Sequence, residues 1–158
     1  MTRAAAVSAL ELRIPPLILL AVAGVVLWLV SDIAPGRLTF PGQDFAAGSL
    51  AFVGVLFCSA GMLALRRFHT TVNPMQPVAT STLVTSGLYR LSRNPMYVGF
   101  GLLLAGWGVF LGNPLAVLIV GVFVAYLNRF QILPEERALR GMFGMAYETY
   151  CREVGRWL

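Results

Sequence analysis

The sequence predicts an all-α integral membrane protein with about four transmembrane helices, because long uncharged runs alternate with segments that contain arginine. Residues 14–31, 45–65 and 94–128 carry no charged side chain. A membrane-spanning helix needs roughly 20 apolar residues, so the first two runs each hold one helix and the third holds two. Hydrophobic residues make up 58% of the chain and charged residues 12%, which excludes an ordinary water-soluble domain.

The expected spans form a single membrane domain and have these approximate limits: 14–33, 45–66, 95–111 and 114–131. Pro15 and Pro16 suit the first turn of the first helix, where a backbone N–H is not needed. Gly112-Asn113-Pro114 interrupts the longest uncharged run, so the third and fourth spans are expected to form a tight hairpin. Both halves of this hairpin are short for a bilayer, which places their cytoplasmic ends below the lipid head groups.

Two polar segments follow the second and fourth spans. Residues 67–94 form a long cytoplasmic connection, which we expect to fold back over the bundle. Residues 134–154 are expected to form amphipathic cytoplasmic helices, with a candidate break at Phe143-Gly144. The first of these helices would begin at Pro134, because proline fits a first turn and the acidic pair that follows complements the helix dipole.

The positions of the arginines predict the orientation in the membrane. All basic residues are arginine, and only Arg37 falls on the side that also carries Asp32 and Asp44. Because basic residues concentrate on the cytoplasmic side, both termini are expected in the cytoplasm, with the helices in an inner or plasma membrane. The net charge of +5 then favours anionic membrane lipids as partners over nucleic acid.

The cysteines and the single histidine predict neither a disulfide nor a metal site. Cys58 lies within a span and Cys151 lies near the C-terminus, so they are not expected to pair. His69 has no companion His, Cys or carboxylate of the kind that binds a metal. Gly54, Cys58 and Gly61 recur at helical spacing in the second span, a pattern typical of close helix packing.

Turn residues and charges concentrate in residues 82–101, at the cytoplasmic end of the third span. This stretch holds two arginines, a Ser-Gly turn, an Asn-Pro break and a G-x-G pair. Taken singly, the arginines are compatible with a role in topology and the glycines with helix packing. The glycines are equally compatible with a ligand that lies against the backbone.

Three motifs in a fixed order resemble the isoprenylcysteine carboxyl methyltransferase family and the related phospholipid methyltransferases. They are L-V-T-S-G-L-Y-R-L-S-R-N-P-M-Y-V-G at 83–99, E-E-R-x-L at 135–139 and F-G-x-x-Y-x-x-Y at 143–150. The resemblance covers residues 80–158, and the first two spans match only as hydrophobic helices. It implies an S-adenosylmethionine-dependent membrane methyltransferase, with a cofactor site formed by the last two spans and capped by the helices of residues 134–154.

The resemblance also assigns roles to individual residues. Gly99 and Gly101 would lie against the cofactor, and the acidic pair would hold its charged region. The expected cofactor-binding residues are Tyr89, Asn94, Pro95, Tyr97, Gly99, Gly101, Asn128, Glu135 and Glu136. The expected catalytic residues are Arg93, Asn94 and Arg137. Asn94 stands where the family has histidine; it can replace that residue in a hydrogen bond to the cofactor but not in proton transfer.

The chemistry of methyl transfer favours one acceptor class. Transfer from a sulfonium to a carboxylate cancels charge in the transition state, so a dry and well-aligned site suffices and no general base is needed. We therefore predict carboxyl O-methylation of an isoprenylcysteine-like or other lipid carboxylate, which enters sideways from the inner leaflet.

The sequence leaves three different functions open beside this one. The first is methylation of an amine, as in a phospholipid N-methyltransferase, whose acceptor would have to lose a proton to Glu135, Glu136 or a tyrosine. The second is a sterol-reductase-like enzyme that uses NADPH, and the third is a non-catalytic membrane scaffold. The sequence does not decide the oligomeric state, or which of Arg93, Arg129 and Arg137 binds a carboxylate.

Overall fold

The computed structural model describes residues 11–33, 36–68, 70, 75 and 80–158, and within these ranges it contains helices and no strands. Arg3, His69 and part of the 67–94 connection lie outside the described residues. Three helical stretches are long and apolar enough to cross a membrane: α2 (Pro16–Ile33), α3 (Gln43–Arg67) and the continuous stretch Ala116–Phe143. The apolar helix α4 (Pro95–Leu111) is shorter. This is the all-helical membrane class that the sequence predicts.

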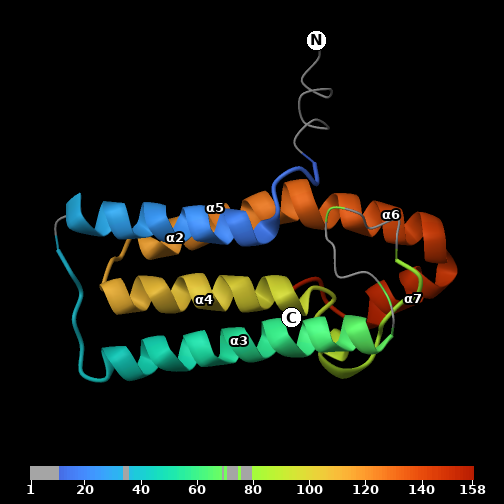
Figure 1. The fold of residues 1–158 in the computed structure, drawn as a ribbon, viewed down its shortest axis with the longest axis horizontal. Helices are drawn as coiled ribbons and strands as arrows, with labels where there is room; N and C mark the ends of the chain where they lie inside the picture. Colours follow the sequence, from blue (N-terminus) through green and yellow to red (C-terminus); the bar gives the residue numbers. More distant parts are fainter. Residues whose placement is uncertain (1–10, 34–35, 69, 71–74, 76–79) are drawn as a thin grey trace, which may run out of the picture.

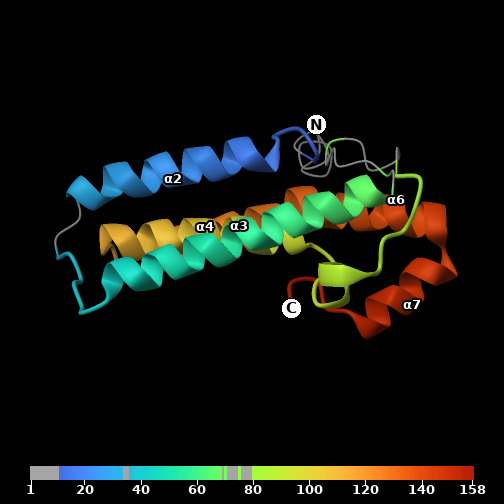
Figure 2. The same cartoon turned by 60° about the horizontal axis from the view of Figure 1, so that its bottom comes forward.

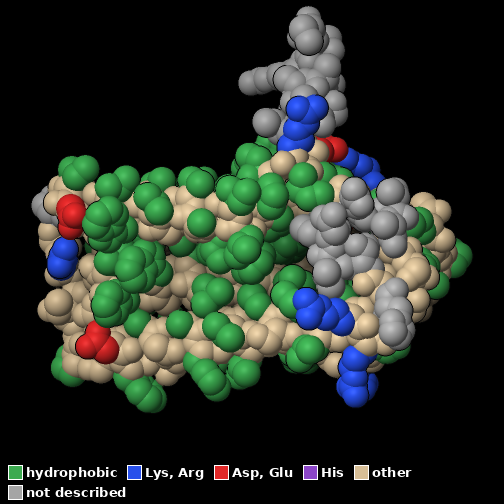
Figure 3. Space-filling model, in the orientation of Figure 1, with side chains coloured by type: hydrophobic (Ala, Val, Ile, Leu, Met, Phe, Trp, Pro, Cys, Tyr) green, Lys and Arg blue, Asp and Glu red, His purple; other side chains and the backbone are tan. Residues whose placement is uncertain are grey.

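Helix α4 occupies the centre of the bundle (Figure 1). It contacts α2, α3 and α5 (Ala116–Tyr126), and α5 also contacts α2. Beyond one end of these helices lie α6 (Leu133–Phe143) and α7 (Met145–Glu153), as the turned view in Figure 2 also shows. Hydrophobic side chains cover the long face in Figure 3, whereas acidic and basic side chains lie toward its two ends. Such an apolar exterior suits contact with lipid.

Close packing of α3 against α4 depends on glycine. A Cβ atom on Gly99 would lie 2.6 Å from the Gly54 carbonyl oxygen, and one on Gly54 would lie 2.9 Å from the Gly99 oxygen. The two backbones therefore touch directly at this point, as small residues allow in membrane helices. Gly101, two residues further along α4, has no atom within 4 Å of its corresponding Cβ position.

Replacing Gly99 with alanine is expected to destabilise the protein by about 1–3 kcal/mol, because the added methyl group forces α3 and α4 apart. Gly101→Ala is the matched control on the same helix, and it is expected to change the stability by no more than about 0.5 kcal/mol. Thermal unfolding of both variants in detergent micelles measures the difference. Equal stability of the two variants would contradict the close contact at Gly99.

The turn between α4 and α5 holds the far end of the bundle together. Gly112 ends α4 with a positive φ of 63°, a conformation that glycine adopts without strain. Its carbonyl accepts a hydrogen bond of 2.8 Å from the Leu38 N–H. Asn113 Nδ2 donates to Ser31 Oγ at 3.1 Å, which ties the turn to α2.

The fourth apolar helix does not end before Pro134, and here the sequence-based prediction of a new helix is wrong. Helix α5 continues through a π-helical segment, η3 (Leu127–Ile132), directly into α6. A proline inside an α-helix normally removes one hydrogen bond and clashes with the preceding turn. The wider π-helical turn before Pro134 changes the local hydrogen-bond pattern. The helix therefore accommodates the proline ring and continues past it. The acidic pair therefore lies within a continuous helix, where no free N-terminus faces it.

The C-terminal segment, residues 154–158, returns to the beginning of α4 (Figure 2). The Arg93 N–H donates to the Gly155 carbonyl at 3.0 Å, and Asn94 Nδ2 donates to the Arg156 carbonyl at 2.9 Å. Trp157 Nε1 donates to Asn128 Oδ1 at 3.0 Å. These bonds fix the start of α4 relative to Asn128, which lies in the middle of the stretch Ala116–Phe143.

Candidate active site

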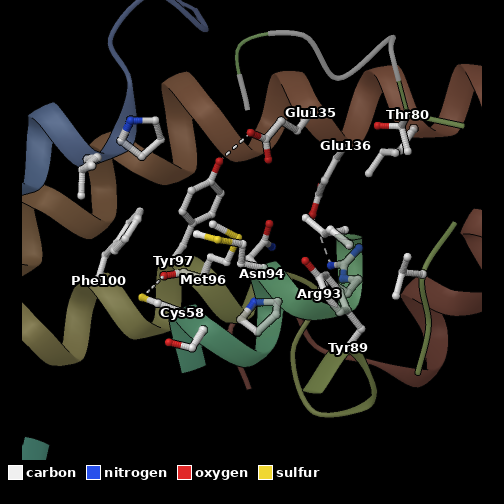
Figure 4. Close-up of a pocket in the computed structure, with 18 of the residues that line it drawn as sticks. Cys58, Thr80, Tyr89, Arg93, Asn94, Met96, Tyr97, Phe100, Glu135 and Glu136 are labelled. Atoms are coloured by element: carbon white, nitrogen blue, oxygen red, sulfur yellow. Dashed lines mark hydrogen bonds and ion pairs between the residues drawn. The ribbon is translucent and has the colours of Figure 1, made fainter. Parts of the chain in front are cut away.

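A cavity of about 550 Å³ lies where α4 begins, and its size falls in the range of small-molecule sites. Side chains from α2, α3, α4, α6 and α7 line it, together with residues 80, 82–84, 89, 93 and 94. Most of the lining is apolar. The polar groups converge on one part of the cavity, as Figure 4 shows: Arg93, Asn94, Tyr97, Glu135 and Glu136.

Glu135 is half-buried in this cavity, and its hydrogen-bond donors among the described residues are neutral. The Tyr97 hydroxyl and Gln131 Nε2 both donate to Glu135 Oε1, each at 2.6 Å. Among the described residues, no arginine lies within ion-pair distance of this carboxylate. A buried carboxylate without a cation is costly, so the site is chemically suited to a positively charged ligand.

Glu136 has the opposite environment. Arg156 donates to both of its carboxylate oxygens at 2.9 Å, and Arg93 lies 3.4 Å away. Arg140, four residues further along the helix, lies at 3.9 Å. The Glu136 side chain is only 3% exposed. The adjacent acids of the E-E pair thus differ: one is neutralised by arginines and the other is not.

Arg93 borders the cavity, and one of its guanidinium donors has no partner among the described residues. Its guanidinium contacts Glu136 and the Cys151 sulfur, and the side chain is 11% exposed. Its Nε atom is buried and has no hydrogen-bond partner among the described residues. A buried donor of this kind is usually satisfied, so the environment of Arg93 Nε is unusual.

Tyrosines form the wall beside Arg93. The Tyr150 hydroxyl donates to the Tyr89 carbonyl at 2.6 Å, which connects α7 to the short helix η2 (Gly87–Arg90). Burial raises the pKa of both Tyr89 and Tyr150, so both remain neutral at physiological pH. This wall offers aromatic surface without charge.

Residues 43–146 match the family model described as phospholipid methyltransferase, which is more than half of the chain. The chain belongs to this family. It is 43% identical over 108 residues to a probable protein-S-isoprenylcysteine O-methyltransferase of Oryza sativa subsp. indica, covering 66% of this chain and 55% of the relative. It is 31% identical over 105 residues to protein-S-isoprenylcysteine O-methyltransferase A of Arabidopsis thaliana, covering 66% of this chain and 53% of that protein.

A third relative is short. An uncharacterized protein of Haemophilus influenzae is 44% identical over 63 residues, which is 40% of this chain and the whole of that protein. No solved structure shows a significant match. The chain spans about half the length of the rice and Arabidopsis relatives. The resemblance to the isoprenylcysteine and phospholipid methyltransferases is confirmed.

The structure brings seven of the residues expected from the family motifs to the cavity and places four elsewhere. Those that line it are Tyr89, Arg93, Asn94, Pro95, Tyr97 and the acidic pair at 135 and 136. Gly99 instead contacts α3, and Asn128 binds Trp157. Gly101 faces open space. The G-x-G pair therefore supports helix packing at its first position, and neither glycine borders the cavity.

Arg137 lies outside the cavity, on a different polar cluster. It forms an ion pair with Glu11, and Arg129 binds the other oxygen of the same carboxylate at 2.8 Å. The Arg129 hydrogen bond is the main cause that lowers the pKa of Glu11. The structure thus separates three arginines that the sequence leaves equivalent: Arg93 borders the cavity, whereas Arg129 and Arg137 bind Glu11.

Several residues of the site are not indicated by the motifs. Gln131 precedes Glu135 by four residues, a spacing that is compatible with contact on one helix face. Cys58 and Met62 of α3 line the cavity, but in the sequence they resemble ordinary residues of an apolar span. Arg156 is one of several arginines on the expected cytoplasmic side, and nothing in the sequence pairs it with Glu136.

Proposed function

We propose that the chain catalyses S-adenosylmethionine-dependent methyl transfer to a lipophilic acceptor at the cytoplasmic face of the membrane. The preferred acceptor is the carboxylate of an isoprenylcysteine-like or other lipid. The main support is Glu135, a carboxylate that no cation among the described residues neutralises, in a cavity whose remaining wall is largely apolar. The family membership and the names of the rice and Arabidopsis relatives support the same reaction class.

The residues of the cavity fit such a cofactor. S-Adenosylmethionine supplies a methyl group on a positively charged sulfur. Glu135, oriented by Tyr97, offers a negative charge to the sulfonium or the ammonium group. Arg93 lines the cavity and offers a positive charge to a carboxylate, and the neutral tyrosines offer aromatic surface. The cavity thus presents both signs of charge that this zwitterionic cofactor requires.

The protein's own contribution is to exclude water and to fix orientation. Pro15, Leu20 and Leu103 form part of an apolar wall that keeps solvent from the polar groups. In a dry site, charges and hydrogen bonds act more strongly than in water. Asn94 is held by the Arg156 carbonyl and not by a titrating partner, which suits a positioning role better than proton transfer.

An amine acceptor is the second candidate, and one observation favours it. Glu135 has no arginine partner among the described residues, so it is able to accept a proton from an ammonium group of a lipid. The description of the matching family, phospholipid methyltransferase, points to the same acceptor class.

The orientation that we propose places the cavity in the cytoplasmic half of the membrane. Arg66 and Arg67 end α3 directly after Leu65, which lines the cavity. Asp32, which pairs with Arg37, lies at the opposite end of α2 from the cavity residues Pro16 and Leu17. Basic residues favour the cytoplasmic side. A cytoplasmic cofactor then reaches the polar part of the cavity directly.

Calorimetric titration of the purified protein in detergent tests the proposed cofactor. We expect binding of S-adenosylmethionine and of S-adenosylhomocysteine, and no binding of NADPH. Binding of NADPH alone would support a reductase, and binding of none of the three would support a scaffold. With methyl-labelled cofactor and membrane lipids, base-labile label released as methanol identifies an ester, whereas base-stable label in lipid identifies an amine.

A further inference from the structure

The segment before α2 supplies a backbone hydrogen bond that Pro134 removes from its own helix. In a regular α-helix the Phe130 carbonyl accepts a hydrogen bond from the N–H four residues later, and Pro134 has no N–H. The Leu12 N–H donates to this carbonyl at 3.0 Å. Figure 1 shows the segment before α2 beside the helix that runs from α5 into α6. A part of the chain far away in sequence thus completes the backbone hydrogen bonding around the π-helical turn.

Glu11 joins the two sides of the same turn through its carboxylate. One oxygen binds Arg129, which precedes Pro134, and the other binds Arg137, which follows it. The Glu11 side chain is 16% exposed, so the ion pairs are partly shielded from water. We call Glu11 and Leu12 together the N-terminal clamp.

The backbone of the N-terminal clamp is strained. Leu12 has a φ of 57°, and it is the only residue other than glycine with a positive φ among those that the structure describes. In this conformation the Cβ atom of leucine lies too close to the following carbonyl oxygen, which costs free energy. Such strain persists only where the surrounding structure holds the backbone in place, and it occurs preferentially at functional sites.

The segment that the N-terminal clamp holds carries two polar residues of the candidate active site. Gln131 lies in the π-helical turn, is 2% exposed and donates to Glu135 Oε1 at 2.6 Å. The Tyr97 hydroxyl donates to the same oxygen (Figure 4). The path of the backbone through this turn therefore decides where the Glu135 carboxylate lies in the cavity.

We propose that Glu11 and Leu12 are positioning residues, which hold the turn at Pro134 in the shape that directs Glu135 into the cavity. This inference rests on the proposed function, because it takes Glu135 as the group that binds the positive charge of the cofactor. The N-terminal clamp lies outside residues 43–146, the part of the chain that matches the family model. The inference therefore concerns a contact between the matched part of this chain and a segment that precedes it.

Hydrogen–deuterium exchange tests the N-terminal clamp without any cofactor. In Glu11→Gln, peptides that contain Leu12 or Gln131 are expected to exchange about tenfold faster than in the wild type, because the turn opens more often. Asp32→Asn is the matched control, since it breaks an ion pair with Arg37 at the other end of α2, and it should leave both peptides unchanged. Unchanged exchange in Glu11→Gln would overturn the inference.

A double-mutant cycle with Pro134→Ala tests the link to the proline. Glu11→Gln is expected to lower the affinity for S-adenosylmethionine about fivefold, as measured by calorimetric titration in detergent. In the Pro134→Ala background the loss should be less than about twofold, because alanine supplies an N–H for the Phe130 carbonyl and the turn depends less on the N-terminal clamp. An equal loss in both backgrounds contradicts a role that depends on Pro134.

Kinetics separate positioning from a purely structural role. In Glu11→Gln the KM for S-adenosylmethionine should rise, whereas the KM for the methyl acceptor should not change. Glu11→Asp keeps the negative charge and should recover part of the cofactor affinity. A lower melting temperature with both KM values unchanged would show that the N-terminal clamp only stabilises the fold, and it would overturn the inference.

The same measurements separate this inference from the proposed function. If the wild type binds no S-adenosylmethionine, the proposed function fails, and the exchange experiment alone then decides whether the N-terminal clamp holds the turn. If the wild type binds S-adenosylmethionine and Glu11→Gln binds it equally well, the proposed function stands and the positioning role is rejected.

Discussion

Replacing Glu135 with glutamine is expected to lower the affinity for S-adenosylmethionine about 100-fold, a loss of about 2–3 kcal/mol. The substitution removes the negative charge that the cavity offers to a cation. It preserves the shape of the side chain, and the amide oxygen still accepts hydrogen bonds from Tyr97 and Gln131. Calorimetric titration in detergent measures the change, and methyl transfer should fall with it.

The same variant should not destabilise the unliganded protein. Wild-type Glu135 is a half-buried carboxylate with only neutral partners among the described residues, and removing such a group from water costs free energy. A neutral amide at this position therefore leaves the melting temperature unchanged or raises it. Unchanged cofactor affinity in Glu135→Gln would show that the cation binds elsewhere. A loss of affinity accompanied by unfolding would show that the charge is structural.

Replacing Glu136 with glutamine is expected to give the opposite result, a destabilisation of about 3–5 kcal/mol. The Glu136 side chain is almost fully buried, and its removal leaves Arg156 and Arg93 without their shared carboxylate. Unfolding in detergent micelles should show a fall in melting temperature of roughly 10 °C. Cofactor binding at low temperature should persist, although weakened.

Two further variants control for this result. Asp32→Asn breaks the ion pair with Arg37 at the other end of the bundle, where both side chains are more than 60% exposed, so no measurable loss is expected. Adding Arg156→Met to Glu136→Gln should recover part of the stability, because one unpaired buried charge is removed. If Glu136→Gln melts like Asp32→Asn, the buried ion-pair cluster does not hold the fold.

The helices could be predicted from the sequence because their causes are local. Uncharged runs locate α2, α3 and α4 within two residues of the observed limits, and Gly112 marks the turn after α4. The continuous helix through Pro134 could not be predicted in this way. No residue composition marks a π-helical turn in a sequence. Such a turn depends on how the helix packs against the rest of the bundle.

The sequence predicts which residues form the site, but it does not predict which side chains bind one another. The motifs indicate Arg93, Tyr97 and the E-E pair, and all of them border one cavity. The motifs could not show that Glu136 binds Arg156 while Glu135 binds Tyr97, since these partners lie 20 and 38 residues away in the chain. Gly99 is expected to contact the cofactor but contacts α3 instead. In a sequence, a glycine that allows close helix packing looks the same as one that allows a ligand to approach the backbone.

The return of residues 154–158 to the start of α4 has a consequence for the order of folding. The chain is synthesised from the N-terminus, so the residues of α2, α3 and α4 are made before Arg156. The ion pair between Glu136 and Arg156, and the hydrogen bond from Asn94 to the Arg156 carbonyl, therefore form only once residues 154–158 have been made. The cavity thus obtains its last structural contacts from the part of the described chain that is synthesised last.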